Sequence, residues 1–100
     1  MSYKYINKQG EEIDISKIDN RYLLNAYHKC RIAAMQSRNN IIYGSMKNLD
    51  QKADTLVSMN RSISEFGFEI ARRLKNKILT KEELIKDMEK RPKIYNKSPH

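Results

Sequence analysis

The sequence predicts a predominantly helical α+β fold: a short N-terminal β-hairpin, a helix, one long coiled-coil-like helix and a short C-terminal helix. Three observations predict this class. Apolar and polar residues alternate up to Ile15, which is the period of a strand. From Ile42 to Leu74 apolar residues recur instead in steps of four and three, as in the seam of a coiled coil. A Thr-x-x-Glu capping box at Thr80 then opens a further helix.

Size and composition place these elements in one small domain. The chain has 100 residues, 39% of them hydrophobic, and no Trp, so its core is small. Because a long helix cannot bury its own apolar seam, we expect a partner chain in a homo-oligomer. We predict one domain over residues 1–92, with the hairpin at 3–15, helices at 20–38, 46–77 and 81–90, and a basic flexible tail at 93–100.

Local signals mark the ends of these elements. Gly10 is expected to adopt a positive φ in the hairpin connection, and Asp19 to cap the first helix. Asn39-Asn40 is a turn signal, so the first helix is expected to fade near residue 38, and Ser45 is the expected N-cap of the long helix. The buried stripe of the first helix is predicted to consist of Leu23, Tyr27, Cys30 and Ala34.

The seam of the long helix is the predicted subunit interface. A polar Asn60 in an apolar seam is expected to fix the register, as buried Asn does in two-stranded coils. The apolar face, which includes Phe66, is wider than two strands require, so this helix is expected to contact both the first helix and a second subunit. The orientation of the two subunits stays open. The predicted interface residues are Leu49, Leu56, Asn60, Ile63, Gly67, Ile70 and Leu74.

The charge balance favours an anionic partner. The net charge is +8, which attracts nucleic acid, an anionic membrane or a phosphorylated small molecule. An alternative explanation is a solvated basic surface in an AT-rich genome, where Lys codons are abundant. The start of the chain lacks a signal-peptide core and no apolar run is long enough to span a membrane. We therefore expect a cytoplasmic protein with no membrane partner.

Catalytic and metal-binding motifs are missing from the sequence. It contains no nucleophile elbow, metalloprotease motif, P-loop or dinucleotide-binding fingerprint. Cys30, the single cysteine, lies on the apolar stripe of the first helix, where packing is its expected role. Metal ligands at ligand spacing are also absent. We expect a protein that is not an enzyme and that uses no metal or cofactor.

Candidate ligand-binding residues gather at the start of the first helix. Free N–H groups there favour an anion, and Arg21 adds a planar guanidinium that matches phosphate. Asn25 and His28 follow on the same face. Tyr22 offers a ring on which a base could stack, and Tyr5 of the hairpin adds aromatic surface. This combination suits a nucleotide or an exposed base.

Structural explanations of these basic residues stay open. Arg21 and Asn25 could instead tie the hairpin to the helix by hydrogen bonds. Arg72 and Arg73, at the end of the long helix, are further candidates for phosphate contacts. Basic residues at a helix C-terminus are, however, also favoured by the helix dipole.

Two adjoining segments carry a resemblance to known proteins. Residues 8–15 read KQGEEIDI and residues 19–26 read DNRYLLNA. Together they resemble the opening of many small phage and prophage proteins, which share a G-x-x-I-x-I hairpin and a D-x-R-[HY]-L-x-N-A helix start. Small phage proteins of this form include anti-defence factors, among them Thoeris-type sponges. The resemblance implies a phage protein that sequesters a cyclic nucleotide immune signal in oligomer pockets, in the host-cell cytoplasm.

Two alternative functions remain. The chain could be a phage inhibitor that binds a host defence protein, such as a nuclease effector, through its basic helices. It could also be a small nucleic-acid-binding protein, whose affinity would fall steeply with salt. No helix-turn-helix spacing is present, and acidic residues are interspersed among the basic ones, which counts against the nucleic-acid alternative.

Overall fold

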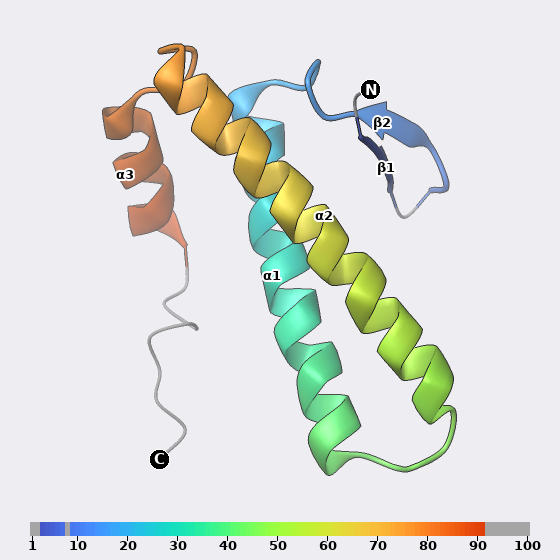
Figure 1. The fold of residues 1–100 in the computed structure, drawn as a ribbon. Helices are drawn as coiled ribbons and strands as arrows, with labels where there is room; N and C mark the ends of the chain where they lie inside the picture. The colour runs from blue at the N-terminus through green and yellow to red at the C-terminus, as the bar shows by residue number, and fades with distance from the viewer. Residues whose placement is uncertain (1–2, 8, 92–100) are drawn as a thin grey trace.

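The computed structural model describes residues 3–7 and 9–91 and confirms the predicted fold class. Helices α1 and α2 form an antiparallel pair, with the hairpin and α3 on opposite sides of it (Figure 1). The predicted tail at 93–100 lies outside the described residues. The elements are β1 (Lys4–Ile6), β2 (Glu12–Asp14), α1 (Asn20–Tyr43), α2 (Leu49–Lys75) and α3 (Lys81–Lys90).

The hairpin is antiparallel and anchored to α2. Tyr5 pairs with Ile13 across the two strands, and Gly10 has the expected positive φ of 81° in the connection. Because two strands alone are marginal in water, the hairpin needs a surface to pack on. The Tyr3 hydroxyl lies 2.8 Å from the Ser62 hydroxyl, and the Tyr5 ring packs edge-on against Phe66, with 5.0 Å between ring centroids.

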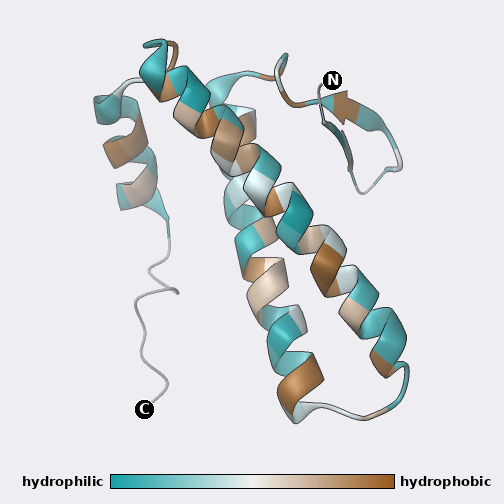
Figure 2. Cartoon of the chain, in the orientation of Figure 1, coloured by the Kyte–Doolittle hydropathy of each residue, from teal (hydrophilic) through white to brown (hydrophobic). Residues whose placement is uncertain are grey.

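The core lies at one end of the helical pair. Leu23, Phe66 and Leu79 are its largest fully buried side chains, and Leu84 of α3 packs against the same cluster. From Met35 to Arg61, no residue is buried. Hydrophobic residues in that half are therefore at most partly covered, and Figure 2 shows hydrophobic residues near the α1–α2 connection.

Helix α1 is longer than predicted, and α2 starts later. The turn signal at Asn39-Asn40 does not end α1, which continues to Tyr43. It stops at Gly44, whose N–H donates to the Asn40 carbonyl at 2.9 Å. A Cβ at Gly44 would lie 2.3 Å from that oxygen, so only glycine fits. The N-cap of α2 is Asn48, at φ 56° and without a side-chain capping bond, instead of Ser45.

Both other helix starts follow the sequence signals. The Asp19 carboxylate accepts the Tyr22 N–H at 2.7 Å at the start of α1. Thr80 and Glu83 form the reciprocal capping box of α3, with the Thr80 hydroxyl accepting the Glu83 N–H at 3.1 Å. These caps depend on neighbouring residues alone, and they set where each helix enters the domain.

The buried face of α2 is centred on polar residues. Ser62, Glu69 and Arg73 are 7%, 7% and 3% exposed. The predicted seam lies beside this centre: Ile63, Ile70 and Leu74 join the core, and a Cβ at Gly67 would lie 3.9 Å from Cε1 of the Tyr27 ring of α1. This half of the seam therefore packs against α1 of the same chain. Of the other predicted interface residues, Asn60 is exposed, and Leu49 and Leu56 are half-buried.

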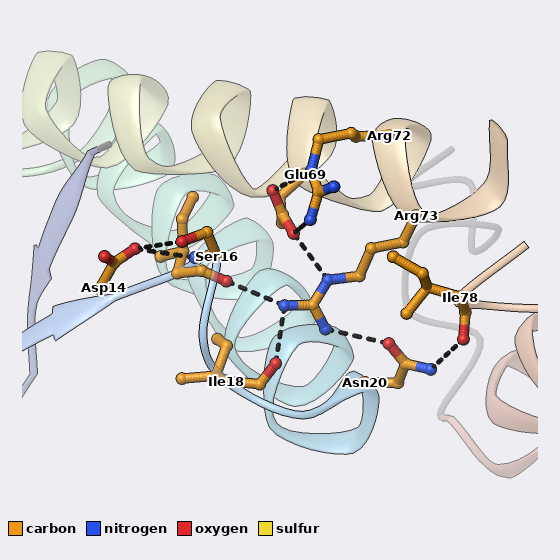
Figure 3. A network of polar contacts seen from close by, with 9 residues as sticks. Asp14, Ser16, Ile18, Asn20, Glu69, Arg72, Arg73 and Ile78 are labelled. Carbon is orange, nitrogen blue, oxygen red and sulfur yellow. Dashed lines mark hydrogen bonds and ion pairs between the residues drawn. The ribbon is translucent and has the colours of Figure 1, made fainter. Parts of the chain in front are cut away.

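Arg73 holds the connections between elements together (Figure 3). Its Nε donates to Glu69 Oε2 at 2.7 Å, and its Nη1 donates to Asn20 Oδ1 at 2.9 Å. Its Nη2 donates to the carbonyls of Ile15 and Ile18, at 3.0 and 2.6 Å. The guanidinium therefore joins α2 to the β2–α1 connection and to the first residue of α1. A buried charge with this many partners is structural.

We predict that Arg73→Ala lowers the free energy of unfolding by about 3–5 kcal/mol, because it removes the buried donor to Asn20 and to the carbonyls of Ile15 and Ile18, and one of the two cations that pair with Glu69. Arg72→Ala is the matched control. Arg72 also pairs with Glu69, but its side chain is 47% exposed, so its loss should lower the free energy of unfolding far less. Urea unfolding followed by circular dichroism measures both, and equal losses would contradict the assignment.

We also predict that the protein loses stability in acid through Glu69. Hydrogen bonding to Arg72, with a further contribution from Arg73, lowers the pKa of Glu69 below its ordinary value of 4.5. The folded state thus favours the carboxylate, and this stabilisation is present above pH 4.5 and is lost as the pH falls through the lowered pKa. Glu69→Gln should be less stable at neutral pH and should lose less stability between pH 5 and pH 3, measured by urea unfolding at each pH. A parallel decline in both proteins would refute this.

Candidate functional site

A groove of about 790 Å³ lies between the hairpin, α1 and the N-terminal half of α2. The hairpin contributes Tyr5 and Gln9, α1 contributes Tyr22 and Lys29, and α2 contributes polar side chains such as Ser58. Its size is in the range of small-molecule sites. The groove exists because the hairpin packs over one side of the helical pair and leaves the neighbouring part of α2 uncovered.

Two ionisable side chains on the inner wall of the groove are uncharged at neutral pH. The Tyr5 hydroxyl lies beside the Cys30 thiol, and burial, followed by the proximity of Cys30, raises the pKa of Tyr5 to about 12. Burial likewise raises the pKa of Cys30, so this residue is a neutral thiol at pH 7. A protonated thiol is a poor nucleophile. These two side chains therefore provide shape and packing to the groove.

The α1 wall carries an aromatic ring and a cation. Tyr22 is 40% exposed, and Lys29 is exposed one heptad further along the same face. Asp54 of α2 also lines the groove. Among the described lining residues the charged groups are thus one cation and one anion, so the groove is close to neutral.

The start of α1 is not arranged as an anion site. Arg21 is exposed but does not line the groove. The Asp19 carboxylate already accepts the Tyr22 N–H, and its negative charge opposes an anion at the helix start. Of the predicted ligand-binding residues, the structure brings Tyr5, Tyr22 and Asn25 together at the groove.

Asn25 and His28 lie near α3. The Arg91 guanidinium donates to Asn25 Oδ1 at 2.6 Å and also pairs with Asp87 at 2.8 Å. Asn25 thus has a structural role, but it links α1 to the end of α3, whereas the role left open from the sequence was a tie to the hairpin. Burial, and then the positive charge of Arg91, lowers the pKa of His28. The neutral imidazole is therefore favoured at pH 7.

The basic residues at the end of α2 are engaged by one carboxylate. Arg72 donates to Glu69 through two nitrogens, at 3.0 and 2.6 Å. Arg73 is 3% exposed and fully engaged with the β2–α1 connection and Glu69. Arg72 keeps an exposed edge, while Arg73 has no surface for a ligand to contact.

Sequence reasoning missed several groove residues. The sequence could have indicated Lys29, because it lies seven residues after Tyr22 on the same face of the helix. Ala26 and Ala33 share this face, which is the groove side of α1. Gln9 and Ser58 carried no such signal. Their position depends on how the hairpin packs against the helices.

Metal clusters, membrane-spanning helices and similarity to known proteins give no further indication of function. In the described part of the chain, no group of three or more His, Cys, Asp or Glu residues could hold a metal ion. None of the described helices is long and apolar enough to cross a membrane. No known protein family, curated protein or solved structure matches the chain.

We predict that His28 titrates below its ordinary pKa of 6.5. Arg91→Ala should raise this pKa, because it removes a nearby positive charge and leaves the opposing carboxylate of Asp87 in place. The chemical shift of the His28 ring protons, followed by NMR from pH 4 to pH 8, measures the change. Arg38→Ala, an exposed change further along α1, is the control and should leave the pKa unaltered. An unshifted His28 in the Arg91 variant would contradict the placement of α3 beside α1.

Proposed function

We propose that this chain is a non-enzymatic binding protein that sequesters a nucleotide-like ligand in the groove between the hairpin and the helical pair. The observation that supports the proposal most directly is the convergence of an exposed Tyr22 ring, the Lys29 ammonium and polar side chains from three elements on one cavity. Pockets that combine apolar walls with a few placed polar groups are typical ligand sites.

The lining suggests how such a ligand would bind. A base stacks on the Tyr22 ring, since every base offers a π-face to an aromatic side chain. Asn7, Gln9 and Ser58 supply hydrogen-bonding groups for the edges of the base and for the sugar. Lys29 pairs with a phosphate as a point charge. Asp54 opposes a high negative charge, so the preferred ligand carries one or two phosphates, as cyclic nucleotides do.

The biological role rests on the resemblance of residues 8–26 to small phage proteins. In that setting the protein would remove a cyclic nucleotide immune signal from the host cytoplasm and so protect the phage. Binding without turnover suffices for this role. The neutral Cys30 thiol and the neutral Tyr5 phenol on the inner wall fit a site that holds its ligand without chemistry.

One feature favours a second function, inhibition of a host protein. At the α1–α2 connection, Ile42, Tyr43 and Met46 are 61%, 82% and 76% exposed. Exposed apolar side chains that lie together often mark protein-binding surfaces. A charged substitution such as Tyr43→Glu would abolish inhibition and leave ligand binding in the groove intact. The two functions are therefore separable by mutation.

We predict that Tyr22→Ala weakens nucleotide binding by about tenfold or more, because stacking on one ring contributes roughly 1–3 kcal/mol. Isothermal calorimetry with adenosine, AMP, cyclic AMP and cyclic dinucleotides measures the effect. Lys29→Gln should weaken binding of the phosphorylated ligands and spare adenosine. Arg21→Gln is the matched control, since it removes the same charge from α1 outside the groove.

The same titrations can refute the proposal. Failure of every ligand to bind the unmodified protein would rule out the groove as a nucleotide site. An effect of Arg21→Gln equal to that of Lys29→Gln would place the ligand at the helix start instead. Affinity for any single-stranded oligonucleotide that falls steeply with salt would favour the nucleic-acid alternative.

A further inference from the structure

The outer face of α2 carries an exposed strip with coiled-coil spacing. From Asp50 to Lys75 every residue at alternating steps of four and three is exposed. The strip includes two large apolar side chains, Val57 and Phe68, which are 69% and 71% exposed. The strip is exposed along its whole length, and at its middle the Arg61 guanidinium lies over the Tyr3 ring of the hairpin, 5.5 Å from the ring centroid. The hairpin and α3 lie on either side of the helical pair (Figure 1).

The spacing of the strip is the same in both directions along the helix. Antiparallel pairing with a second copy therefore places each strip residue opposite another strip residue. In that register Val57 faces the partner's Phe68, and Arg61 faces the partner's Ser64, whose small side chain leaves it room. The two-fold axis passes near the middle of α2, as an isologous contact requires.

In the same antiparallel pairing, charged residues of opposite sign in the two copies lie close to each other. Asp50 comes opposite the partner's Lys75 at both ends of the contact, and Asp54 comes opposite Ala71, beside the partner's Arg72. A parallel pairing would bring Asp50 against Asp50 and Lys75 against Lys75, which is unfavourable. Antiparallel pairing also sets the two helix dipoles head to tail.

We infer that a second copy of this chain docks antiparallel along the outer face of α2, with Val57 and Phe68 at its centre and Asp50–Lys75 ion pairs at its ends. The contact spans about 38 Å of helix, given 1.5 Å per residue. Because each copy contributes only two large apolar side chains, we expect a weak dimer that dissociates on dilution. The interface uses a different face of α2 from the seam predicted from sequence, and it meets the edge of the groove at Asp54.

Sedimentation equilibrium from low to high micromolar protein tests the interface. Phe68→Ser should raise the dimer dissociation constant at least about 30-fold, which corresponds to roughly 2 kcal/mol for lost burial of two such side chains per dimer. Met88→Ser, a 63% exposed apolar position on α3, is the matched control and should leave the constant unchanged. A monomeric protein throughout this range, or equal effects of the two variants, would overturn the inference.

A charge-swap cycle tests the antiparallel register. Asp50→Lys and Lys75→Glu should each raise the dissociation constant about tenfold, because each creates two like-charge contacts per dimer. The double variant restores the pairs and should return to within about threefold of the original value. Lys86→Glu on α3 is the control for net charge. A double variant that is as weak as the single variants would refute the antiparallel arrangement, and calorimetry on the Phe68→Ser protein reports groove binding separately.

Discussion

The ion pair between Arg73 and Glu69 lies where four segments of the chain meet. The Arg73 guanidinium is buried, so each of its N–H groups needs a partner. It finds them in Glu69, in Asn20 at the start of α1, and in the β2–α1 connection. Asn20 in turn donates to the Ile78 carbonyl between α2 and α3. This network ties the β2–α1 connection to α2, and the contacts of Tyr3 with Ser62 and of Tyr5 with Phe66 hold the hairpin itself against α2 beside the groove.

The small core has a direct consequence for function. Its largest members, such as Leu23 and Phe66, lie at the end of the helical pair where Arg73 is, and no residue from Met35 to Arg61 is buried. The core therefore stabilises one end of the helical pair, and side chains along the rest of α1 and α2 stay exposed or partly exposed. A shallow groove on one side and an apolar strip on another are both products of this uneven distribution.

The groove and the outer strip lie side by side on α2 and share Asp54. Ser58 lines the groove, while its neighbour Val57 belongs to the strip, about 100° further around the helix. Antiparallel docking through the strip would bring the partner's helix to the edge of the groove at Asp54. A binding protein built this way would present two equivalent sites per dimer, and each site would be complete within one chain.

The sequence by itself determined the order of the elements and the starts of α1 and α3, because these starts depend on neighbouring residues; the start of α2 was predicted at Ser45 and lies at Asn48 instead. Asp19, Thr80 and Gly10 act as predicted, and Tyr5 and Tyr22 both reach the groove. The predicted end of α1 near residue 38 was wrong. Asn39-Asn40 disfavours a helix only weakly, and the helical residues on both sides outweigh it.

The tertiary structure decided which face of α2 is buried and what its charges do. A periodicity argument assumes that the most apolar face is the buried one. It therefore predicted the apolar seam as the centre of the buried face of α2 and Arg73 as an exposed ligand contact. In the structure the centre is shared by Ser62, Glu69 and Arg73. A buried charge is stabilised by partners distant in the chain, here the carbonyls of Ile15 and Ile18. No local pattern encodes those partners, and only the packed domain brings them together.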